Sequence, residues 1–412
     1  MVNVLDKKDC CGCESCVQKC PQQCICLIED EEGFLYPRVD TELCVNCGLC
    51  EKVCPVINQG EEREPLQTYA AKNPDETIRM NSSSGGVFTA LATNVIERKG
   101  VVFGASFNKK WEVVHSYAET IEECSKFRGS KYVQSQIGNS YKDVETFLKA
   151  NRIVLFSGTP CQIAGLKLYL RKNYDNLLTV DFICHGVPSP GIFRWYLLEE
   201  MENVAYLGDK KNTVSFRPIH SIPERDALEK VDGVRIKGIS FRNKKEGWKK
   251  FSFVLDLAKA TAEGEKNSVS LSYTLDKNPF LRGFLKDLYL RPSCHHCPAK
   301  CLKSGSDITI ADFWGIQKVM PEFDDDKGIN VVMINTEKGK KFYNGLGVIN
   351  INTNLKVVKK YNPAVSSNPR ITSQRSLMFS NDMGFKDKVL LLAKPTFNEK
   401  LKIALKSIFG RK

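Results

Sequence analysis

The sequence repeats one cysteine pattern within its first 55 residues, as CCGCESCVQKCP at residues 10–21 and CVNCGLCEKVCP at residues 44–55. Each copy has the spacing C-x2-C-x2-C-x3-C and is followed by proline. The chain of 412 residues holds seventeen cysteines, an odd total that argues against a complete disulfide framework. Clustered thiols in a chain of this size without a secretory signal bind metal more often than they form disulfides. We therefore expect a metal-binding protein of a reducing, cytoplasmic compartment.

This spacing resembles the bacterial ferredoxin run, in which three thiolates bind one cluster and the fourth binds the other. Three closely spaced thiolates on a tight turn reach three irons of one cubane, while the fourth iron faces away and needs a ligand from elsewhere. The pattern predicts two 4Fe–4S clusters, with zinc knuckles or a disulfide knot as the alternative. The predicted ligands are Cys10, Cys13, Cys16 and Cys54 for cluster I, and Cys44, Cys47, Cys50 and Cys20 for cluster II.

The segment between the two runs predicts a β-hairpin packed on the clusters. Residues 25–28 and 34–36 are apolar stretches on either side of the acidic, glycine-ended turn at residues 29–33. Three more cysteines fall outside the ligand pattern and are predicted to be small buried fillers of this module: Cys11, Cys24 and Cys26.

Charge divides the chain into two parts, which we call the head (residues 1–62) and the body (residues 63–412). The head holds 5 Lys/Arg against 12 Asp/Glu, a net charge of −7, and the body holds 55 against 36, a net charge of +19. A basic body attracts anions such as nucleotide phosphates or an acidic electron-carrier protein, although ordinary solvated surface is the alternative. We do not expect nucleic-acid binding, because interleaved aromatics and a recognisable binding module are missing.

A glycine-rich helix start follows a polar linker early in the body. The residues NSSSGG at 81–86 precede an apolar stripe at helical spacing, which ends before Gly100. The free N–H groups of such a start favour an anion such as pyrophosphate, while a simple N-cap on a core helix is the alternative. The turn at residues 128–132 adds two cations, Arg128 and Lys131, that suit a phosphate or a plain surface turn.

Two predicted strands lead into cysteines. A strand at residues 152–157 is followed by a helix that Thr159 caps, which places Cys161 in the first helical turn, where the helix dipole lowers a thiol pKa. A second strand at residues 177–183 ends in Cys184. This succession predicts parallel pairing, with both cysteines at the carboxyl ends of neighbouring strands.

Another C-x2-C pair, Cys294 and Cys297, is followed closely by Cys301. Two thiolates on a turn need partners, and Cys161 and Cys184 are available. A third 4Fe–4S cluster is therefore the economical interpretation.

Histidines leave an alternative open at this third site. Because His295 and His296 stand between the paired cysteines, a zinc site is possible there. His185 is interpreted as structural rather than as a proton donor, and Cys124 as an inert core thiol.

Taken together, the motifs of the body resemble the family of coenzyme F420 hydrogenase/dehydrogenase beta subunits. They are NSSSGGVF (81–88), RGSKYVQ (128–134), GTPCQIAG (158–165), DFICHGVP (181–188) and the stretch from RPSC to DFWG (291–315). The whole chain looks like the form fused to an N-terminal two-cluster ferredoxin, often met among bacterial polysaccharide-biosynthesis proteins. The resemblance implies an FAD beside a 4Fe–4S cluster, passing electrons between iron–sulfur carriers and a hydride acceptor. It does not settle whether coenzyme F420 itself is used.

The resemblance also implies site residues. By motif position, the family's cluster ligands fall on Cys161, Cys184, Cys294 and Cys297, and Cys301 is a departure that could replace one of them. The family's flavin contacts fall on Ser83, Ser84, Gly85, Gly86, Arg128, Lys131 and Asp312.

We therefore expect an α+β protein, in which a small bacterial-type ferredoxin domain precedes an α/β flavin-binding domain with a mixed, partly parallel sheet. The expected divisions are residues 1–62 (ferredoxin domain), 63–150 (N-terminal, flavin-binding part of the beta subunit), 151–345 (its C-terminal, iron–sulfur and flavin part) and 346–412 (basic C-terminal extension). The expected function is a flavo-iron–sulfur oxidoreductase that relays electrons from an electron-donor or acceptor protein through FAD to a small molecule. A non-catalytic electron-transfer subunit of a larger complex is the alternative.

The end of the chain predicts a basic amphipathic helix. Residues 386–412 hold 8 Lys/Arg and 2 Asp/Glu, around an apolar stripe that includes Leu401, Leu405 and Ile408. Such a helix packs on its own domain more often than on a membrane surface. Because no apolar run approaches the roughly 18 residues of a spanning helix, we expect no permanent membrane association.

Overall fold

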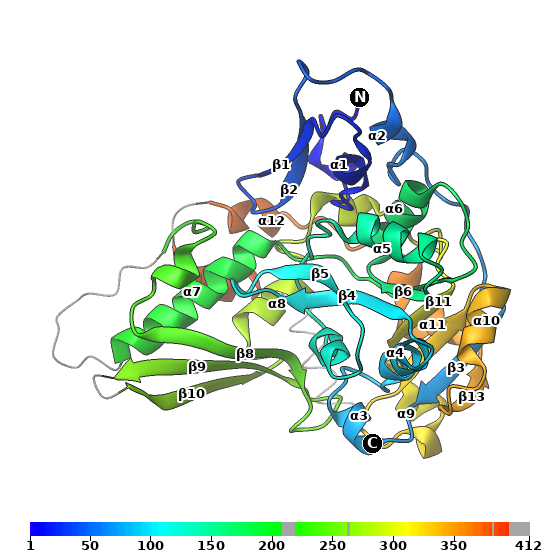
Figure 1. Ribbon diagram of the computed structural model, residues 1–412. Helices are drawn as coiled ribbons and strands as arrows, with labels where there is room; N and C mark the ends of the chain where they lie inside the picture. The colour runs from blue at the N-terminus through cyan, green and yellow to red at the C-terminus, as the bar shows by residue number, and fades with distance from the viewer. Residues whose placement is uncertain (208–218, 262–263, 381–382, 395–412) are drawn as a thin grey trace.

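The computed structural model describes residues 1–207, 219–261, 264–380 and 383–394 (Figure 1). The apolar stripe predicted near residues 401–409 lies outside these residues. Within them, no helix combines the length and the apolar character needed to cross a membrane. None of the seventeen cysteines forms a disulfide bond.

The head is a small unit at the N-terminus, coloured blue at the top of Figure 1. Its strands β1 (Ile25–Glu29) and β2 (Leu35–Val39) pair antiparallel, which is the predicted hairpin. Its short helices are η1 (Lys7–Asp9), α1 (Ser15–Lys19) and α2 (Leu49–Lys52). Glu14 and Gly48, with φ of 60° and 71°, turn the chain just before α1 and α2 so that each cysteine run doubles back.

The body is built on an eight-stranded sheet in the order β13-β3-β12-β11-β7-β6-β4-β5. The strands are β3 (Gln67–Lys72), β4 (Val101–Phe107), β5 (Val113–Ala118), β6 (Val154–Ser157), β7 (Leu177–Phe182), β11 (Ile308–Asp312), β12 (Asn330–Ile334) and β13 (Ile349–Thr353). The central strands β4, β6, β7 and β11 run parallel, and the other pairings are antiparallel. The sheet is therefore mixed and partly parallel, as predicted.

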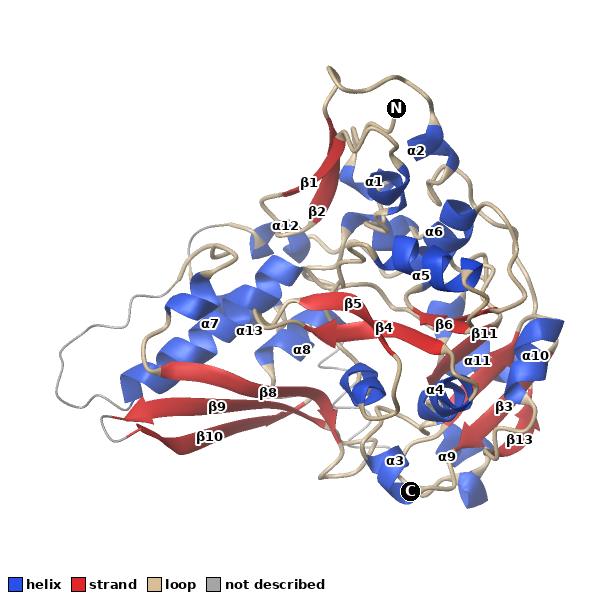
Figure 2. Ribbon diagram, in the orientation of Figure 1, coloured by secondary structure: helices blue, strands red, loops and turns tan. Residues whose placement is uncertain are grey.

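Helices cover both faces of this sheet (Figure 2). They are α4 (Val87–Glu97) and α10 (Glu337–Tyr343) on one face, and α5 (Ser140–Lys149) and α6 (Pro160–Leu170) on the other. The strands alternate between the two apolar cores: Leu155 packs with α4, whereas its neighbours Val154 and Phe156 pack with α5 and α6. In this three-layer arrangement, the carboxyl ends of the parallel strands β6 and β7 lie together at one edge of the sheet.

A second sheet, which the sequence did not predict, lies to one side. It is antiparallel in the order β10-β9-β8, with β8 (Val234–Asn243), β9 (Ser252–Thr261) and β10 (Gly264–Thr274). It packs on three helices, α7 (Pro190–Leu207), α8 (Pro279–Leu285) and α13 (Phe385–Leu392). Their shared core is aromatic and includes Trp195, Tyr196, Phe253, Phe280 and Phe385.

Short helices complete the described chain. They are α3 (Glu76–Met80), η2 (Glu123–Phe127), η3 (Ala227–Lys230), η4 (Pro292–His296), α9 (Ile316–Val319), η5 (Pro321–Phe323), α11 (Leu355–Tyr361), η6 (Pro363–Val365) and α12 (Gln374–Met378).

Candidate functional site

The predicted ligands of cluster II come together in one small pocket of the head. Its walls include all four of them, Cys20, Cys44, Cys47 and Cys50. Cys24 also lines this pocket, with its Sγ 3.4 Å from that of Cys20, and desolvation raises the pKa of the Cys24 thiol to about 12. Cys20 therefore lies with the second cysteine run and not with its own.

The predicted ligands of cluster I form a second, more buried group. Burial raises the pKa of the Cys16 thiol well above its ordinary value, and the thiols of Cys13, Cys10 and Cys54 raise it further. Cys54, from the second run, thus lies beside three cysteines of the first. This is the arrangement that crossed ligation requires.

The third predicted set also comes together. Burial raises the pKa of the Cys184 thiol well above its ordinary value, and three other thiols add to the effect: Cys294, Cys161 and Cys297. Cys301 lies elsewhere, beside Glu62, and burial is the main cause of its raised pKa.

Local structure explains where these thiols point. Thr159 caps α6 through a capping box with Gln162, and Pro160 occupies the first turn, as the sequence indicated. Cys161 follows at the carboxyl end of β6. The pKa of its thiol is lowered to about 7, first by the neighbouring Cys11 thiol, while Thr159 and the backbone N–H of Cys161 at the helix start add to the effect.

Among the described residues, no group of three or more His, Cys, Asp or Glu is close enough to hold a single metal ion. A cubane cluster holds its four thiolates farther apart than one ion does, so this finding leaves the predicted cluster sites as they are. The thiol chemistry of all three sets fits iron–sulfur clusters.

The other cysteines divide into buried and exposed ones. Cys11 and Cys24 are buried, as predicted, and Cys124 lies in the apolar core beneath the sheet. The prediction that Cys26 is a buried filler is wrong. It sits on the outward face of β1, where the alternation of a strand turns every second side chain to solvent.

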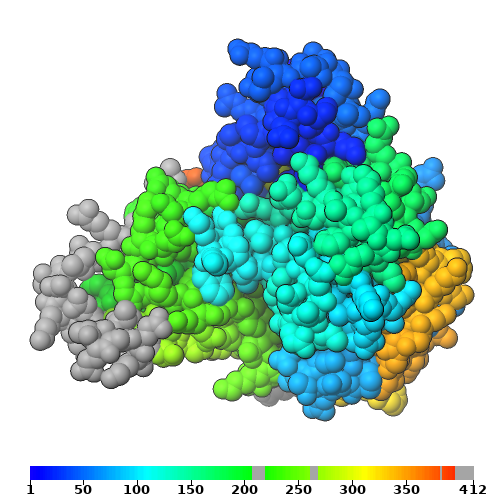
Figure 3. Space-filling model, in the orientation of Figure 1, coloured from blue at the N-terminus to red at the C-terminus, as the bar shows by residue number. Residues whose placement is uncertain are grey.

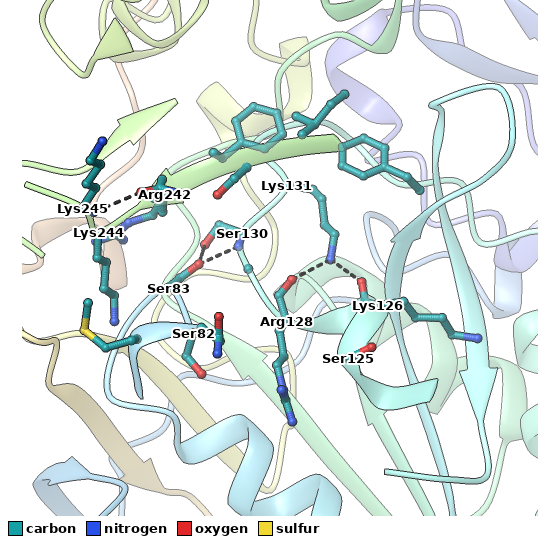
Figure 4. A pocket seen from close by; sticks show the side chains of 18 residues that line it. Ser82, Ser83, Ser125, Lys126, Arg128, Ser130, Lys131, Arg242, Lys244 and Lys245 are labelled. Atoms are coloured by element: carbon teal, nitrogen blue, oxygen red, sulfur yellow. Dashed lines mark hydrogen bonds between the residues drawn. The ribbon is translucent and has the colours of Figure 1, made fainter. Parts of the chain in front are cut away.

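A cavity of about 510 Å³ lies between the body's two sheets (Figure 4). Six cations line it: Lys126, Arg128, Lys131, Arg242, Lys244 and Lys245. No lining residue is acidic in the described part of the chain. Phe107 and Phe241 contribute apolar wall. A cavity of this character suits a ligand that carries both a dianionic phosphate group and an aromatic ring.

Three of the predicted flavin contacts line this cavity, namely Ser83, Arg128 and Lys131. The Ser83 hydroxyl accepts hydrogen bonds from the Ser130 backbone N–H (2.6 Å) and hydroxyl (2.9 Å), which joins the two predicted loops. The Lys131 ammonium donates to the carbonyls of Lys126 (2.8 Å) and Arg128 (3.2 Å), as Figure 4 shows, and desolvation lowers its pKa to about 7.

The other four predicted contacts, Ser84, Gly85, Gly86 and Asp312, stand behind the cavity wall. The Ser84 hydroxyl donates to the carbonyl of Ile329, and a Cβ at Gly85 would meet the carbonyl oxygen of Ala71 at 2.6 Å. These residues therefore shape the loop rather than line the cavity.

Gly86 and Asp312 affect the cavity indirectly, through the positions of neighbouring residues. Gly86 takes φ of +81° at the N-cap of α4, and the first helical N–H, of Val87, donates to the Asn330 side chain. Asp312 pairs with Arg242. Burial opposes the charge of Arg242, and the ion pair outweighs it, so the arginine pKa is raised.

Arg242 and Lys244 of the cavity wall were missed by the sequence reasoning. Lys244 donates to the carbonyls of Arg79, Ser84 and Lys327, and desolvation lowers its pKa to about 7. The basic stretch FRNKKEGWKK at residues 241–250 was the available signal.

Unpaired donors indicate that this cavity fits an anion. Among the described residues, Nε of Arg128 and both Nε and Nη2 of Arg242 are buried without a hydrogen-bond partner. A buried donor without a partner is costly, so a phosphate oxygen is a natural acceptor. The residues present therefore fit FAD or a similar phosphate-bearing cofactor.

Ring contacts connect the cavity with the third cysteine set. Phe241 of the cavity wall packs on Tyr132 (5.7 Å between ring centroids), and Tyr132 stacks on Phe284 (5.1 Å). Phe284 meets the ring of His185 (5.5 Å), the residue after Cys184. The His185 Nε2 lies 2.6 Å from a carboxylate oxygen of Asp287.

Family models match both the body and the head. Two halves of the beta subunit of "Coenzyme F420 hydrogenase/dehydrogenase" match the body, the N-terminal half at residues 68–141 and the C-terminal half at residues 151–353. A "4Fe-4S binding domain" matches residues 37–56.

Curated relatives fall into the same two groups. The F subunit of the F(420)H(2) dehydrogenase of Methanosarcina mazei is 25% identical over 198 residues, covering 45% of this chain and 55% of the relative. Ferredoxin 7Fe of Hydrogenibacillus schlegelii is 38% identical over 64 residues, covering 15% of this chain and 76% of the ferredoxin. The chain thus spans about half the length of the dehydrogenase component that it matches.

One solved structure, of the F420-reducing NiFe hydrogenase complex from Methanosarcina barkeri, aligns with a TM-score of 0.43 at 17% identity, over 74% of this chain and 90% of that chain. That likeness is too distant to bear on function. The two matched halves of the body and the ferredoxin relative are the findings that decide the family. The chain belongs to the family of coenzyme F420 hydrogenase/dehydrogenase beta subunits and carries a 4Fe–4S ferredoxin domain at its N-terminus.

Proposed function

We propose that this chain is an iron–sulfur flavoprotein that exchanges electrons between a protein redox partner and a small hydride donor or acceptor. The observation that carries the proposal is the cation-lined cavity, joined by the ring contacts from Phe241 to His185 to the third cysteine set. When bound, the clusters carry single electrons, and FAD exchanges them for two-electron chemistry.

The chain's own residues supply binding and positioning. Arg128 and Arg242 offer unpaired guanidinium donors to phosphate oxygens, and Asp312 holds Arg242 in place. Lys244 draws together three carbonyls beneath the cavity, which fixes the loop at residues 81–86. The predicted third cluster takes its ligands from Cys161, Cys184, Cys294 and Cys297.

Two questions define the alternatives within this proposal. The first is the identity of the small hydride donor or acceptor. Coenzyme F420 is a candidate because it appears in the name of another relative, the coenzyme F420-dependent sulfite reductase of Methanocaldococcus jannaschii. That relative is 28% identical over 172 residues, covering 40% of this chain and 26% of the reductase. The second alternative is a non-catalytic electron-transfer subunit. Nothing in the comparisons supports a role in polysaccharide biosynthesis.

The test uses the full chain, purified anaerobically and supplied with iron, sulfide and FAD. We expect bound FAD and its bleaching by reduced methyl viologen, followed by reoxidation with coenzyme F420 or with a nicotinamide coenzyme. Bleaching without reoxidation by any small molecule would favour the electron-transfer role. A chain that binds neither FAD nor FMN would overturn the flavoprotein proposal.

A further inference from the structure

The head touches the body at a glycine. Gly165 lies in α6, one helical turn after Cys161, and its backbone faces the head. A Cβ built on Gly165 would come within 2.6 Å of Ser15 Oγ, 3.0 Å of Cys13 Cβ and 3.1 Å of Cys13 Sγ. Its backbone is helical, so a side chain here is excluded by lack of space rather than by conformation.

The residues at this contact belong to two different predicted clusters. Cys13 is in the set of cluster I, and Cys161 is in the third set. Cys11 is 5% exposed, and the neighbouring thiols of Cys13 and Cys161 are the first causes of its raised thiol pKa, which places it between the two. We call Cys11, Cys13, Ser15, Cys161 and Gly165 the head–body seam.

Buried polar contacts hold the seam in register. Arg291, 1% exposed, donates from Nε to the Cys10 carbonyl (2.7 Å) and from Nη2 to the Leu35 carbonyl (3.0 Å). The Glu14 carboxylate accepts the backbone N–H groups of Ile137 and Gly138, each at 2.9 Å. Because unmaking such buried contacts is costly, the head is fixed on the body and does not swing on a tether.

The acidic turn of the head strengthens this attachment. Glu29 pairs with Arg194 and Glu32 pairs with Arg375, so the opposite charges of head and body meet at their interface. In Figure 3 the head, in dark blue, lies directly against the body.

The cluster II pocket faces the other way. All of its lining residues belong to the first 50 of the chain, and Cys47 is exposed. Leu43 and Val45 beside it are 58% and 61% exposed. The head therefore presents cluster I to the body and cluster II to the outside.

We infer that Gly165 is a positioning residue for electron exchange between head and body, because its bare backbone sets the separation of the cluster I ligands from the third cysteine set. The inference rests on the proposed function. Each crossing moves one electron and no atoms, so one cluster is oxidised by one unit as the other is reduced by one. Cluster II is the site at which the head exchanges electrons with the external redox partner.

The test compares Gly165→Ala with the unchanged full-length protein, both reconstituted with iron and sulfide and reduced with dithionite. We expect unchanged iron content but a weakened magnetic interaction between cluster I and the third cluster in the EPR spectrum. The Cys184→Ser variant supplies the reference spectrum without the third cluster. Freeze-quench EPR after mixing with reduced methyl viologen should show a severalfold slower reduction of the third cluster.

A double variant separates displacement of the head from damage to α6. Ser15→Gly removes the atom nearest the added methyl group, so Gly165→Ala with Ser15→Gly should recover much of the interaction. Hydrogen exchange at the Ile137 and Gly138 amides should rise in Gly165→Ala and fall back in the double variant, because these amides report on Glu14.

The possible outcomes are distinct. The inference is overturned if Gly165→Ala alters neither the magnetic interaction nor the reduction rate of the third cluster. It is also overturned if the unmodified protein holds three clusters and shows no interaction between cluster I and the third cluster. If the unmodified protein binds no iron at the third site, the iron count shows that the third cluster of the proposed function is missing, and the inference falls with it.

Discussion

The cluster II pocket and the cation-lined cavity are built in opposite ways. The pocket takes all of its walls from the first 50 residues. The cavity draws on separate stretches near residues 80–83, 107, 125–131 and 239–245, which meet only when both sheets of the body are in place. A site made by one short segment depends on local turns, whereas the cavity depends on the whole body. A substitution in the cluster II pocket should therefore have a local effect, whereas a substitution in the cavity should affect the whole body.

The strongest test of this contrast is the loss of a ligand from the third set, which is assembled over a long stretch of chain. Cys184→Ser should remove about four of about twelve irons per chain and leave the head clusters in place. Cys301→Ser is the matched control and should keep all of the iron, because Cys301 lies beside Glu62. Iron and acid-labile sulfide assays on both variants measure the loss of the third cluster. Iron loss in the control and not in Cys184→Ser would mean that the fourth ligand is Cys301.

A smaller but broader effect is expected at the cavity. Arg242→Met leaves Asp312 without its ion-pair partner, and breaking a buried ion pair in this way costs about 3 to 5 kcal/mol. FAD affinity should fall about ten- to a hundredfold with the loss of a charge-assisted phosphate contact. Denaturant unfolding and flavin titration measure the two effects.

The double variant Arg242→Met with Asp312→Asn separates stability from binding. It removes both charges while an amide oxygen still accepts from the Trp248 indole N–H. Stability should largely return and FAD affinity should not. Recovery of both would show that Arg242 supports the fold alone.

The smallest effect is a pH dependence of FAD binding. Desolvation lowers the pKa of Lys131 to about 7 in the empty cavity, and a bound phosphate favours the charged form and so raises it. Binding therefore takes up protons above pH 7, and affinity should fall as pH rises, by at most about tenfold per pH unit for this lysine. Titrations in a pH series measure the slope. Lys131→Met should flatten it, and an equal slope in that variant would point to Lys244 instead.

The residues alone predicted those parts whose determinants are close together along the chain, whereas the long-range grouping of the third cysteine set was implied by the family resemblance. The two cysteine runs, the hairpin between them and the cap of α6 each depend on residues within about a dozen positions. The crossed grouping of Cys20 and Cys54 was also predicted, because the geometry of a cubane dictates it.

Other features depend on tertiary contacts and were not predicted. Lys244 gains its role from carbonyls of Arg79, Ser84 and Lys327, which lie 165, 160 and 83 positions away from it in sequence. The side sheet of β8, β9 and β10 was missed because none of its strands carries one of the recognised motifs. The prediction for Cys26 failed because a strand's alternation decides exposure, and the composition of the segment does not.

The attachment of Arg291 to the Cys10 carbonyl has a consequence for biosynthesis, since these residues stand 281 positions apart. At translation rates of about 5 to 20 residues per second, the first cysteine run leaves the ribosome on the order of 10 to 60 seconds before Arg291 does. During that interval the cluster I thiols are uncovered. This interval gives cluster delivery time to precede the closure of the head by the body, and a chain whose head is loaded later must open this interface to receive iron.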